Sequence, residues 1–266
     1  MQKRKIAIIG VGMVGASTAF SLVTQGVCDE VMLVDINKDR AIGEMTDLRH
    51  SIDFLNHNVK ITTGNYEDCG DADIIVLTAG PAPRQGENRL DTLPRSAKII
   101  EQIVSPIMKS GFNGHFVVIS NPVDIISYFV YKLSRLPKNQ VIGTGTSLDS
   151  ARLKSYIGEQ FHIDPRSVNA FVMGEHGDSQ VVPWSLVTVG GKSMKNVMED
   201  NPGLAREISF ATLEERTTKA GWEIIRSKGA TYYGIATACA GIIQAIVYDE
   251  NRIVPVSTLL EGEYGL

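Results

Sequence analysis

The chain has 266 residues, enough for one large domain or two smaller ones with a substantial core. Its hydrophobic content of 43% and charged content of 21% are ordinary for a soluble globular protein. The formal net charge of -4, without a basic cluster, argues against a nucleic-acid partner, and no apolar run is long enough to span a membrane. The cysteines, at positions 28, 69 and 239, are too far apart in sequence for a CxxC pair, so we expect a reducing, cytoplasmic location without a metal site.

Short apolar runs alternate with segments of helical period through the first half of the chain. We predict buried strands at 6–9, 30–34, 59–62, 74–77, 116–120 and 141–143. Helices are predicted between several of them, at 13–25, 38–48, 97–109 and 123–133. Strand, helix and strand in this order predict a parallel sheet with right-handed crossovers.

The segment GVGMVG at 10–15 follows the first predicted strand and opens the first predicted helix. Gly10 permits a tight turn, Gly12 lets a pyrophosphate approach the backbone, and Gly15 lets helix and strand pack closely. The helix N-terminus offers N–H groups to phosphates. The next strand leads to Asp35, whose carboxylate suits the ribose of NAD and repels the 2′-phosphate of NADP. A tight turn without a ligand is the alternative.

A polar segment at 78–91 leaves the carboxyl end of the fourth predicted strand and contains two arginines, Arg84 and Arg89. Ligands bind at this edge of an open parallel sheet, and such a loop can close over a substrate and carry an arginine with it. A solvated surface loop with exposed arginines is the alternative.

Three further motifs carry polar side chains. Asn121 in SNPVD either caps the next helix or points its amide at the nicotinamide end of a cofactor. Asp149 and Arg152 in SLDSARL share one helix face, although a capping aspartate with an incidental ion pair would look the same. His176 in GEHGDS can exchange a proton near neutral pH, unless it is only a surface-loop histidine.

The second half of the chain has fewer regular patterns. Strand character is predicted on both sides of the His176 loop, at 168–172 and 181–189, and again at 253–259. Helices are predicted at 204–226 and 232–247, and the second is so apolar that it is expected to be packed or to form a subunit contact.

These motifs together resemble the L-lactate/malate dehydrogenase family over the whole chain. The resemblance rests on GVGMVG with Asp35, GENR, SNPVD, SLDSARL and GEHGDS in the right order, and KGATYYGIA is similar to the L-lactate branch. It implies an α/β fold in which a Rossmann-type parallel sheet domain, at 1–143, binds NAD and a smaller α+β domain, at 144–266, is catalytic. It also implies a homodimer or homotetramer. Family members continue through further strands and a C-terminal helix, so we expect the chain to be truncated after Leu266.

The resemblance gives the motifs roles in the NAD-dependent reduction of a 2-oxo acid to an L-2-hydroxy acid. His176 would be the acid/base, and Asp149 would hold its tautomer and stabilise the imidazolium. Arg152 would bind the substrate carboxylate, and Arg89 would polarise the reacting carbonyl. The substrate pocket would also include Asn121 and Thr231, and the cofactor would contact Gly10, Gly12, Met13, Val14, Gly15, Asp35, Ala79, Gly80, Asn121 and Ile235.

The residue six positions before Arg89 affects the choice of substrate. Lactate enzymes usually have glutamine there and malate enzymes arginine, whereas this chain has Pro83 with Arg84 beside it. Proline offers a substrate neither a hydrogen bond nor a charge. We therefore expect pyruvate first, a longer apolar 2-oxo acid of the L-2-hydroxyisocaproate type second, and oxaloacetate only if Arg84 turns inward.

Two further expectations concern activity and regulation. A catalytically silent NAD-binding protein is the competing class. Such a protein would need none of the four side chains expected to act on the substrate, which are those of His176, Asp149, Arg152 and Arg89. Bacterial family members activated by fructose 1,6-bisphosphate resemble one another in a basic pair, at positions that here hold Lys154 and Asn169. Only one positive charge is kept, so we expect weak or no activation.

Overall fold

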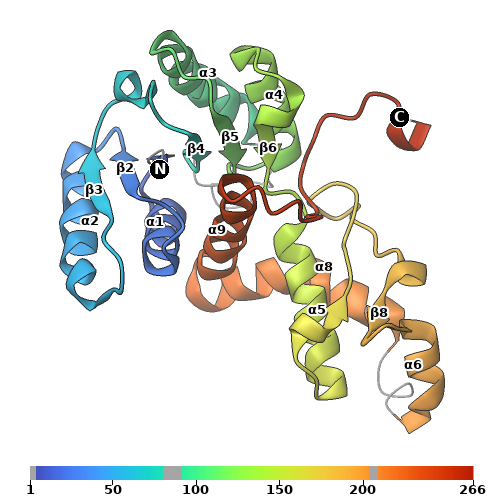
Figure 1. Ribbon diagram of the computed structural model, residues 1–266. Helices are drawn as coiled ribbons and strands as arrows, with labels where there is room; N and C mark the ends of the chain where they lie inside the picture. The colour runs from blue at the N-terminus through green and yellow to red at the C-terminus, as the bar shows by residue number, and fades with distance from the viewer. Residues whose placement is uncertain (1–3, 81–91, 204–208, 266) are drawn as a thin grey trace. The chain divides into compact units, whose positions relative to one another are not determined.

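The computed structural model describes residues 4–80, 92–203 and 209–265 (Figure 1). The chain forms two compact units. The first comprises Met1–Thr144, Tyr232–Arg252 and Ser257–Leu266, and the second comprises Gly145–Thr231 and Ile253–Val256. The chain therefore passes through each unit more than once.

The first unit contains a six-stranded parallel sheet with the strand order β3-β2-β1-β4-β5-β6. Its strands are β1 (Lys5–Ile9), β2 (Glu30–Val34), β3 (Lys60–Thr63), β4 (Ile74–Leu77), β5 (His115–Val118) and β6 (Val141–Gly143). All four residues of β4 are buried, as expected for a parallel strand covered on both faces. The predicted parallel sheet is confirmed, with strand ends displaced by one or two residues.

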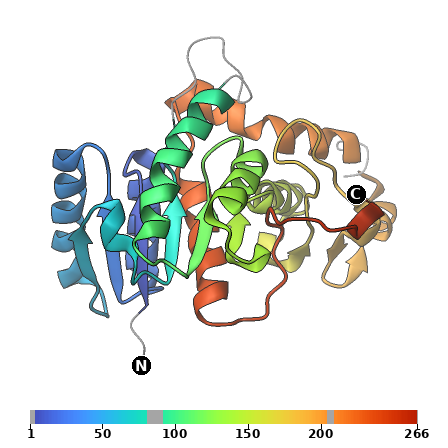
Figure 2. The same cartoon turned by 90° about the horizontal axis from the view of Figure 1, so that it is seen from above.

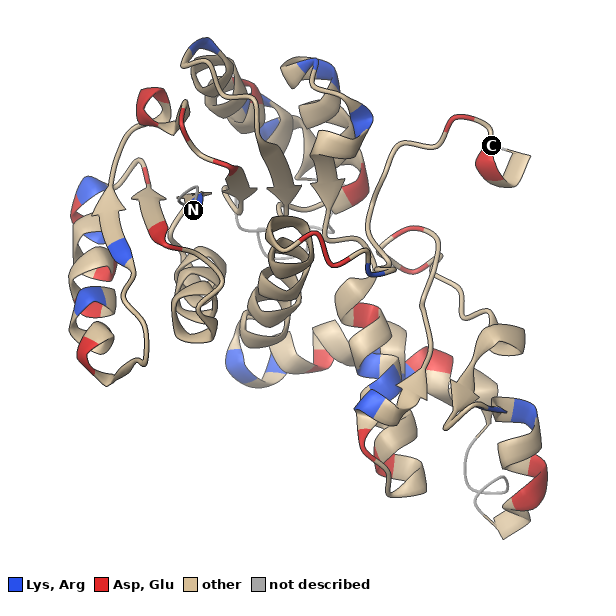
Figure 3. Cartoon of the chain, viewed as in Figure 1, with Lys and Arg blue, Asp and Glu red and all other residues tan. Residues whose placement is uncertain are grey.

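Helices cover both faces of this sheet. They are α1 (Met13–Gln25), α2 (Lys38–Ser51), α3 (Leu93–Lys109), α4 (Val123–Ser134) and α9 (Tyr233–Val247). Figures 1 and 2 show α3 and α4 together on one face, and α1 beside α9 on the other. α2 carries charges along its length, whereas α9 has none (Figure 3). The apolar α9 is explained by its packing along α1.

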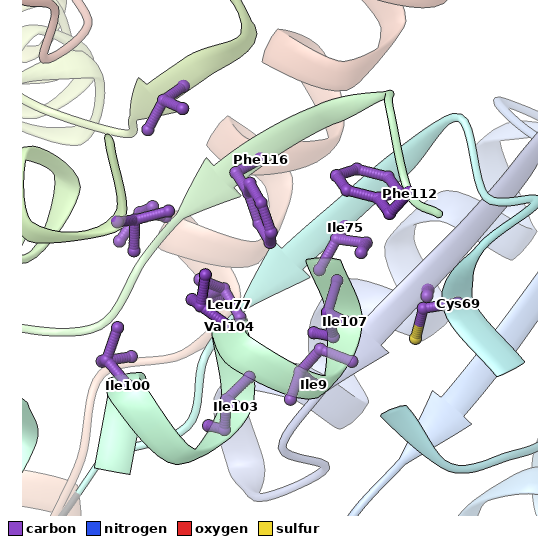
Figure 4. Packing of buried hydrophobic residues seen from close by; sticks show 14 of the residues in the cluster. Ile9, Cys69, Ile75, Leu77, Ile100, Ile103, Val104, Ile107, Phe112 and Phe116 are labelled. Carbon is purple, nitrogen blue, oxygen red and sulfur yellow. The ribbon is translucent and has the colours of Figure 1, made fainter. Parts of the chain in front are cut away.

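One core of the first unit lies between the sheet and the pair α3 and α4. Alternate residues of the strands, such as Ile75 and Leu77 of β4, point to this side and meet Ile100, Val104 and Ile107 of α3 (Figure 4). These side chains are at most 2% exposed. The i, i+4 and i+7 spacing along α3 places its three residues on one face, which explains the amphipathic pattern of this helix.

The second unit is smaller and contains α5 (Ser147–Phe161), α6 (Met194–Asp200) and α8 (Phe210–Lys228), with an antiparallel sheet of β7 (Val168–Asn169), β8 (Thr188–Val189) and β9 (Lys192–Ser193). Its core joins Leu153 and Ile157 of α5 to Val172 and Leu213, all of which are fully buried. The core therefore packs α5 against the chain that leads to the His176 loop.

Two predicted strands are wrong. The segment 181–189 contains a short 3₁₀ turn at Trp184–Leu186 and only two strand residues, and 253–259 contributes one isolated bridge, between Ser257 and Gly143. Each segment contains a proline, Pro183 or Pro255, which has no N–H to donate to a ladder. The predicted helix at 204–226 is found as α8, which begins at Phe210 and ends two residues later than expected.

Candidate functional site

The glycine loop of the first unit lies where the strand order reverses. The chain runs from β1 outward to β2 and β3, and then returns to β4 on the other side of β1. At the carboxyl ends of β1 and β4, Thr78 Oγ1 donates a hydrogen bond of 2.6 Å to the carbonyl of Gly10. Ligands of open α/β sheets bind at this kind of switch point.

The three glycines of GVGMVG differ in what an added side chain would meet at each position. Gly10 has a φ of +92°, and a Cβ on Gly15 would lie 1.9 Å from the carbonyl oxygen of Gly10. A Cβ on Gly12, in contrast, would meet nothing within 4 Å. The fold itself therefore requires Gly10 and Gly15, whereas the open space at Gly12 fits the approach of a phosphate group.

The start of α1 also fits an anionic group. The helix begins at Met13 without a side-chain cap and without an acidic residue in its first turn. Its first N–H groups and the positive end of its dipole therefore suit phosphate.

Asp35 contacts the same loop. One carboxylate oxygen accepts a hydrogen bond of 2.8 Å from the Val11 N–H, and the other accepts one of 2.8 Å from the Asn37 N–H. Carboxylate oxygens each accept more than one hydrogen bond, so these contacts leave capacity for ribose hydroxyls. The residues of the first unit therefore fit NAD.

In the second unit Asp149 joins His176 to Arg152. Its Oδ2 atom lies 2.6 Å from His176 Nδ1, and its Oδ1 atom accepts a hydrogen bond of 3.0 Å from Arg152 Nη1. The side chains of Asp149, Arg152 and His176 are 3%, 12% and 14% exposed. This cluster favours a functional role over a solvated loop histidine or an incidental surface ion pair.

The buried position of Asp149 alone would raise its pKa. The hydrogen bond from His176, the charge on that ring and the contact with Arg152 outweigh this effect, and the net result is a lowered pKa. Asp149 is therefore a carboxylate near neutral pH, and its two oxygens can accept hydrogen bonds from both neighbours.

Local structure explains how these side chains meet. Asp149 is in the first turn of α5 and Arg152 follows one turn later, so both lie on one helix face. His176 lies in a loop that begins at Gly174, where φ is +84°, and that is closed by backbone hydrogen bonds between Met173 and Val181. The glycine permits the left-handed turn that leads into the loop.

Three further predicted site residues, Asn121, Thr231 and Ile235, lie beside or within helices of the described chain. Asn121 precedes α4, but Pro122 holds the N-cap position and no side chain caps the helix, so the capping alternative for Asn121 is wrong. Thr231 and Ile235 are half-buried, before and within the first turn of α9. The predictions that concern Arg89, and those for Pro83 and Arg84, lie outside the described residues.

Sequence motifs do not single out two hydroxyls that flank Asp149, those of Thr146 and Ser150. Both are buried and contact the chain before the His176 loop.

Among the described residues, none of the helices is long and apolar enough to cross a membrane. The same part of the chain holds no group of three His, Cys, Asp or Glu side chains suited to a metal ion.

Comparisons with known proteins identify the family of both halves of the chain. The family model of the lactate/malate dehydrogenase NAD-binding domain matches residues 4–143, and that of the alpha/beta C-terminal domain matches residues 146–266. L-lactate dehydrogenase 3 of Bacillus anthracis is 55% identical over 98% of this chain and 83% of its own length. L-lactate dehydrogenase 1 of Bifidobacterium longum subsp. longum is 47% identical over 100% of this chain and 84% of its own length.

Two solved structures give the same result. A lactate dehydrogenase from a Medee basin deep-sea metagenome library has a TM-score of 0.93 and 44% identity, over 99% of this chain and 84% of its own. The ligand-bound minor L-lactate dehydrogenase of Enterococcus mundtii has a TM-score of 0.94 and 42% identity, over 100% of this chain and 84% of its own. The chain therefore belongs to the lactate/malate dehydrogenase family, with an NAD-binding Rossmann domain and an alpha/beta C-terminal domain.

Proposed function

We propose that the chain catalyses the reversible, NAD-dependent reduction of pyruvate to L-lactate. The observation that carries this proposal is the Asp149 carboxylate, which contacts an imidazole and a guanidinium in one buried cluster. An acid/base and a carboxylate-binding group are the two functions that a small 2-oxo acid requires. The L-lactate dehydrogenases among the relatives support pyruvate as the substrate.

His176 would exchange the proton. Because Nδ1 faces a carboxylate acceptor, its N–H donates a hydrogen bond to Asp149. Nε2 is then the nitrogen that would give a proton to the 2-oxo oxygen on reduction and remove it from the hydroxyl on oxidation. Asp149 stabilises the imidazolium, which is the form needed for reduction. NADH would supply the hydride.

Arg152 would bind the substrate carboxylate. Only one of its nitrogens is bonded to Asp149 in the contacts above, and a guanidinium has further donors for a bidentate contact. Arg89 would polarise the reacting carbonyl, and Asn121 and Thr231 would line the pocket. The cofactor would contact the glycine loop with Asp35, together with Met13, Val14, Ala79, Gly80, Asn121 and Ile235.

Most of the proposed NAD contacts come from 1–143, whereas 144–266 would supply the acid/base, its aspartate partner and the arginine that binds the substrate carboxylate. We also propose a homodimer or homotetramer, on the family relationship alone. A longer apolar 2-oxo acid and oxaloacetate remain the alternative substrates, because Pro83 provides neither the hydrogen bond nor the charge that would select among them.

NADH oxidation, followed by absorbance with pyruvate, 2-oxoisocaproate and oxaloacetate in parallel, tests the proposal. We expect the pyruvate rate to exceed the other two. A higher rate with 2-oxoisocaproate or oxaloacetate would reassign the substrate. Tight NADH binding without oxidation of NADH by any of the three acids would favour the catalytically silent NAD-binding protein instead.

A further inference from the structure

The peptide groups of Val172 are held by two side chains, one at the N-cap of α5 and one in its first turn. Thr146 Oγ1 donates a hydrogen bond of 2.6 Å to the Val172 carbonyl, and Ser150 Oγ accepts one of 2.8 Å from the Val172 N–H. Val172 is fully buried and lies beyond the end of β7. Side chains therefore replace the strand partner that its backbone would otherwise need.

The hydroxyl of Thr146 is in an unusual role for its position. Thr146 is the N-cap residue of α5, where a threonine side chain normally accepts a hydrogen bond from an N–H of the first turn. No such cap is formed here, and the hydroxyl donates to Val172 instead. Ser150 lies one helical turn after Thr146, so the two hydroxyls face the same segment.

Asp149 lies between these two residues in sequence and contacts His176, four residues after Val172. The residue after Val172, Met173, exchanges backbone hydrogen bonds of 2.8 and 2.9 Å with Val181 on the far side of the loop. This pair closes the His176 loop at its base. One helical turn of α5 therefore fixes both the start of the loop and the imidazole that the loop carries.

We propose that Thr146 and Ser150 are positioning residues, whose hydroxyls hold the Val172 peptide groups and so set the His176 ring against Asp149. This inference rests on the proposed function, because it concerns the group that would transfer the proton. The distance between His176 Nδ1 and Asp149 Oδ2 is 2.6 Å. A displacement of the loop by about 1 Å would break this hydrogen bond and would lower turnover roughly 100-fold at most.

The experiment compares Thr146→Val with Thr146→Ser. Valine keeps the branched shape but removes the donor, and little capping is lost because the side chain forms no cap. Serine keeps the hydroxyl. We expect Thr146→Val to lower kcat about 10- to 100-fold with substrate KM and NADH Kd little changed, and Thr146→Ser to restore most of kcat.

Thr217→Val is the matched control. Thr217 is 1% exposed, and its hydroxyl donates a hydrogen bond of 2.7 Å to Leu213 within α8. Like Thr146→Val, this variant loses a buried hydroxyl, but the hydrogen bond that it loses lies within α8 and does not reach the segment before the His176 loop. We expect a comparable loss of Tm with an unchanged kcat, whereas a purely structural role for Thr146 would give both variants the same kcat.

The result that overturns the proposal is a Thr146→Val enzyme with the kcat of the wild type, or a Thr217→Val enzyme whose kcat falls as much as that of Thr146→Val.

If the wild type turns over none of the three oxo acids, the proposed function fails, and proton NMR of the free protein decides the positioning role. The Nδ1 proton shared between His176 and Asp149 should give a downfield resonance, identified by its loss in His176→Asn. Thr146→Val should shift or broaden this resonance and Thr217→Val should not; equal spectra would refute the positioning role.

Discussion

Replacing Asp149 by asparagine tests the central contact of the proposed catalytic cluster, which consists of Asp149, Arg152 and His176. The asparagine oxygen can accept a hydrogen bond from either His176 or Arg152. The NH₂ group of asparagine then faces the other of these two residues, and two donors cannot form a hydrogen bond. At least one charge-assisted hydrogen bond, of 2.6 or 3.0 Å, is therefore lost. A hydrogen bond to a charged group contributes about 1.5–3 kcal/mol, which corresponds to a roughly 10- to 150-fold fall in kcat/KM.

The assay is NADH oxidation at saturating NADH over a range of pyruvate concentrations. Asp164→Asn is the control, because Asp164 also contacts an arginine, Arg166, and its pKa is lowered to about 2, but this ion pair is exposed. Surface pairs contribute little, so this variant should keep its activity. An Asp149→Asn enzyme as active as Asp164→Asn would show that the buried carboxylate does not support the imidazolium.

Further predictions concern the imidazole, the glycine loop, acid stability and regulation. His176→Ala should abolish turnover and keep NADH binding; equal loss of both would make His176 structural. Gly12→Val should weaken NADH binding with a smaller loss of Tm than Gly15→Ala, because only the Cβ at position 15 would lie 1.9 Å from a carbonyl oxygen. Because the folded-state pKa of Asp149 lies below 3.8, its stabilising contribution is present above this pH and is lost as the pH falls through the lowered pKa. The unfolding free energies of the wild type and Asp149→Asn, measured with denaturant, should therefore converge only in strongly acid solution. Fructose 1,6-bisphosphate should leave the apparent KM for pyruvate nearly unchanged, and a large drop would contradict this.

Much of the first unit could be predicted from its sequence, since its signals are local. A buried parallel strand is apolar throughout, as at 74–77, and a glycine loop between such a strand and a helix is typical of a dinucleotide-binding turn. The predicted cluster of Asp149, Arg152 and His176 depended on the family resemblance, because nothing in the spacing of 149 and 176 requires contact.

The second unit was harder to predict for physical reasons. Pro183 and Pro255 interrupt segments whose valine and isoleucine content favours strands. The prediction followed this apolar content, although each proline lacks the N–H that a strand ladder needs. The hydroxyls of Thr146 and Ser150 find partners 26 and 22 residues away. A threonine before a helix indicates a cap, so its tertiary contact replaced the local one that the sequence favours.

The contact between Asp35 and the Val11 N–H has a consequence for redesign of the coenzyme preference. The carboxylate that we propose as the contact of the NAD ribose also accepts hydrogen bonds from two backbone amides, at Val11 and Asn37. Exchanging it for a small or basic residue to admit NADP would leave both amides without their acceptor. A successful exchange therefore has to supply a replacement acceptor for these amides as well as a site for the extra phosphate.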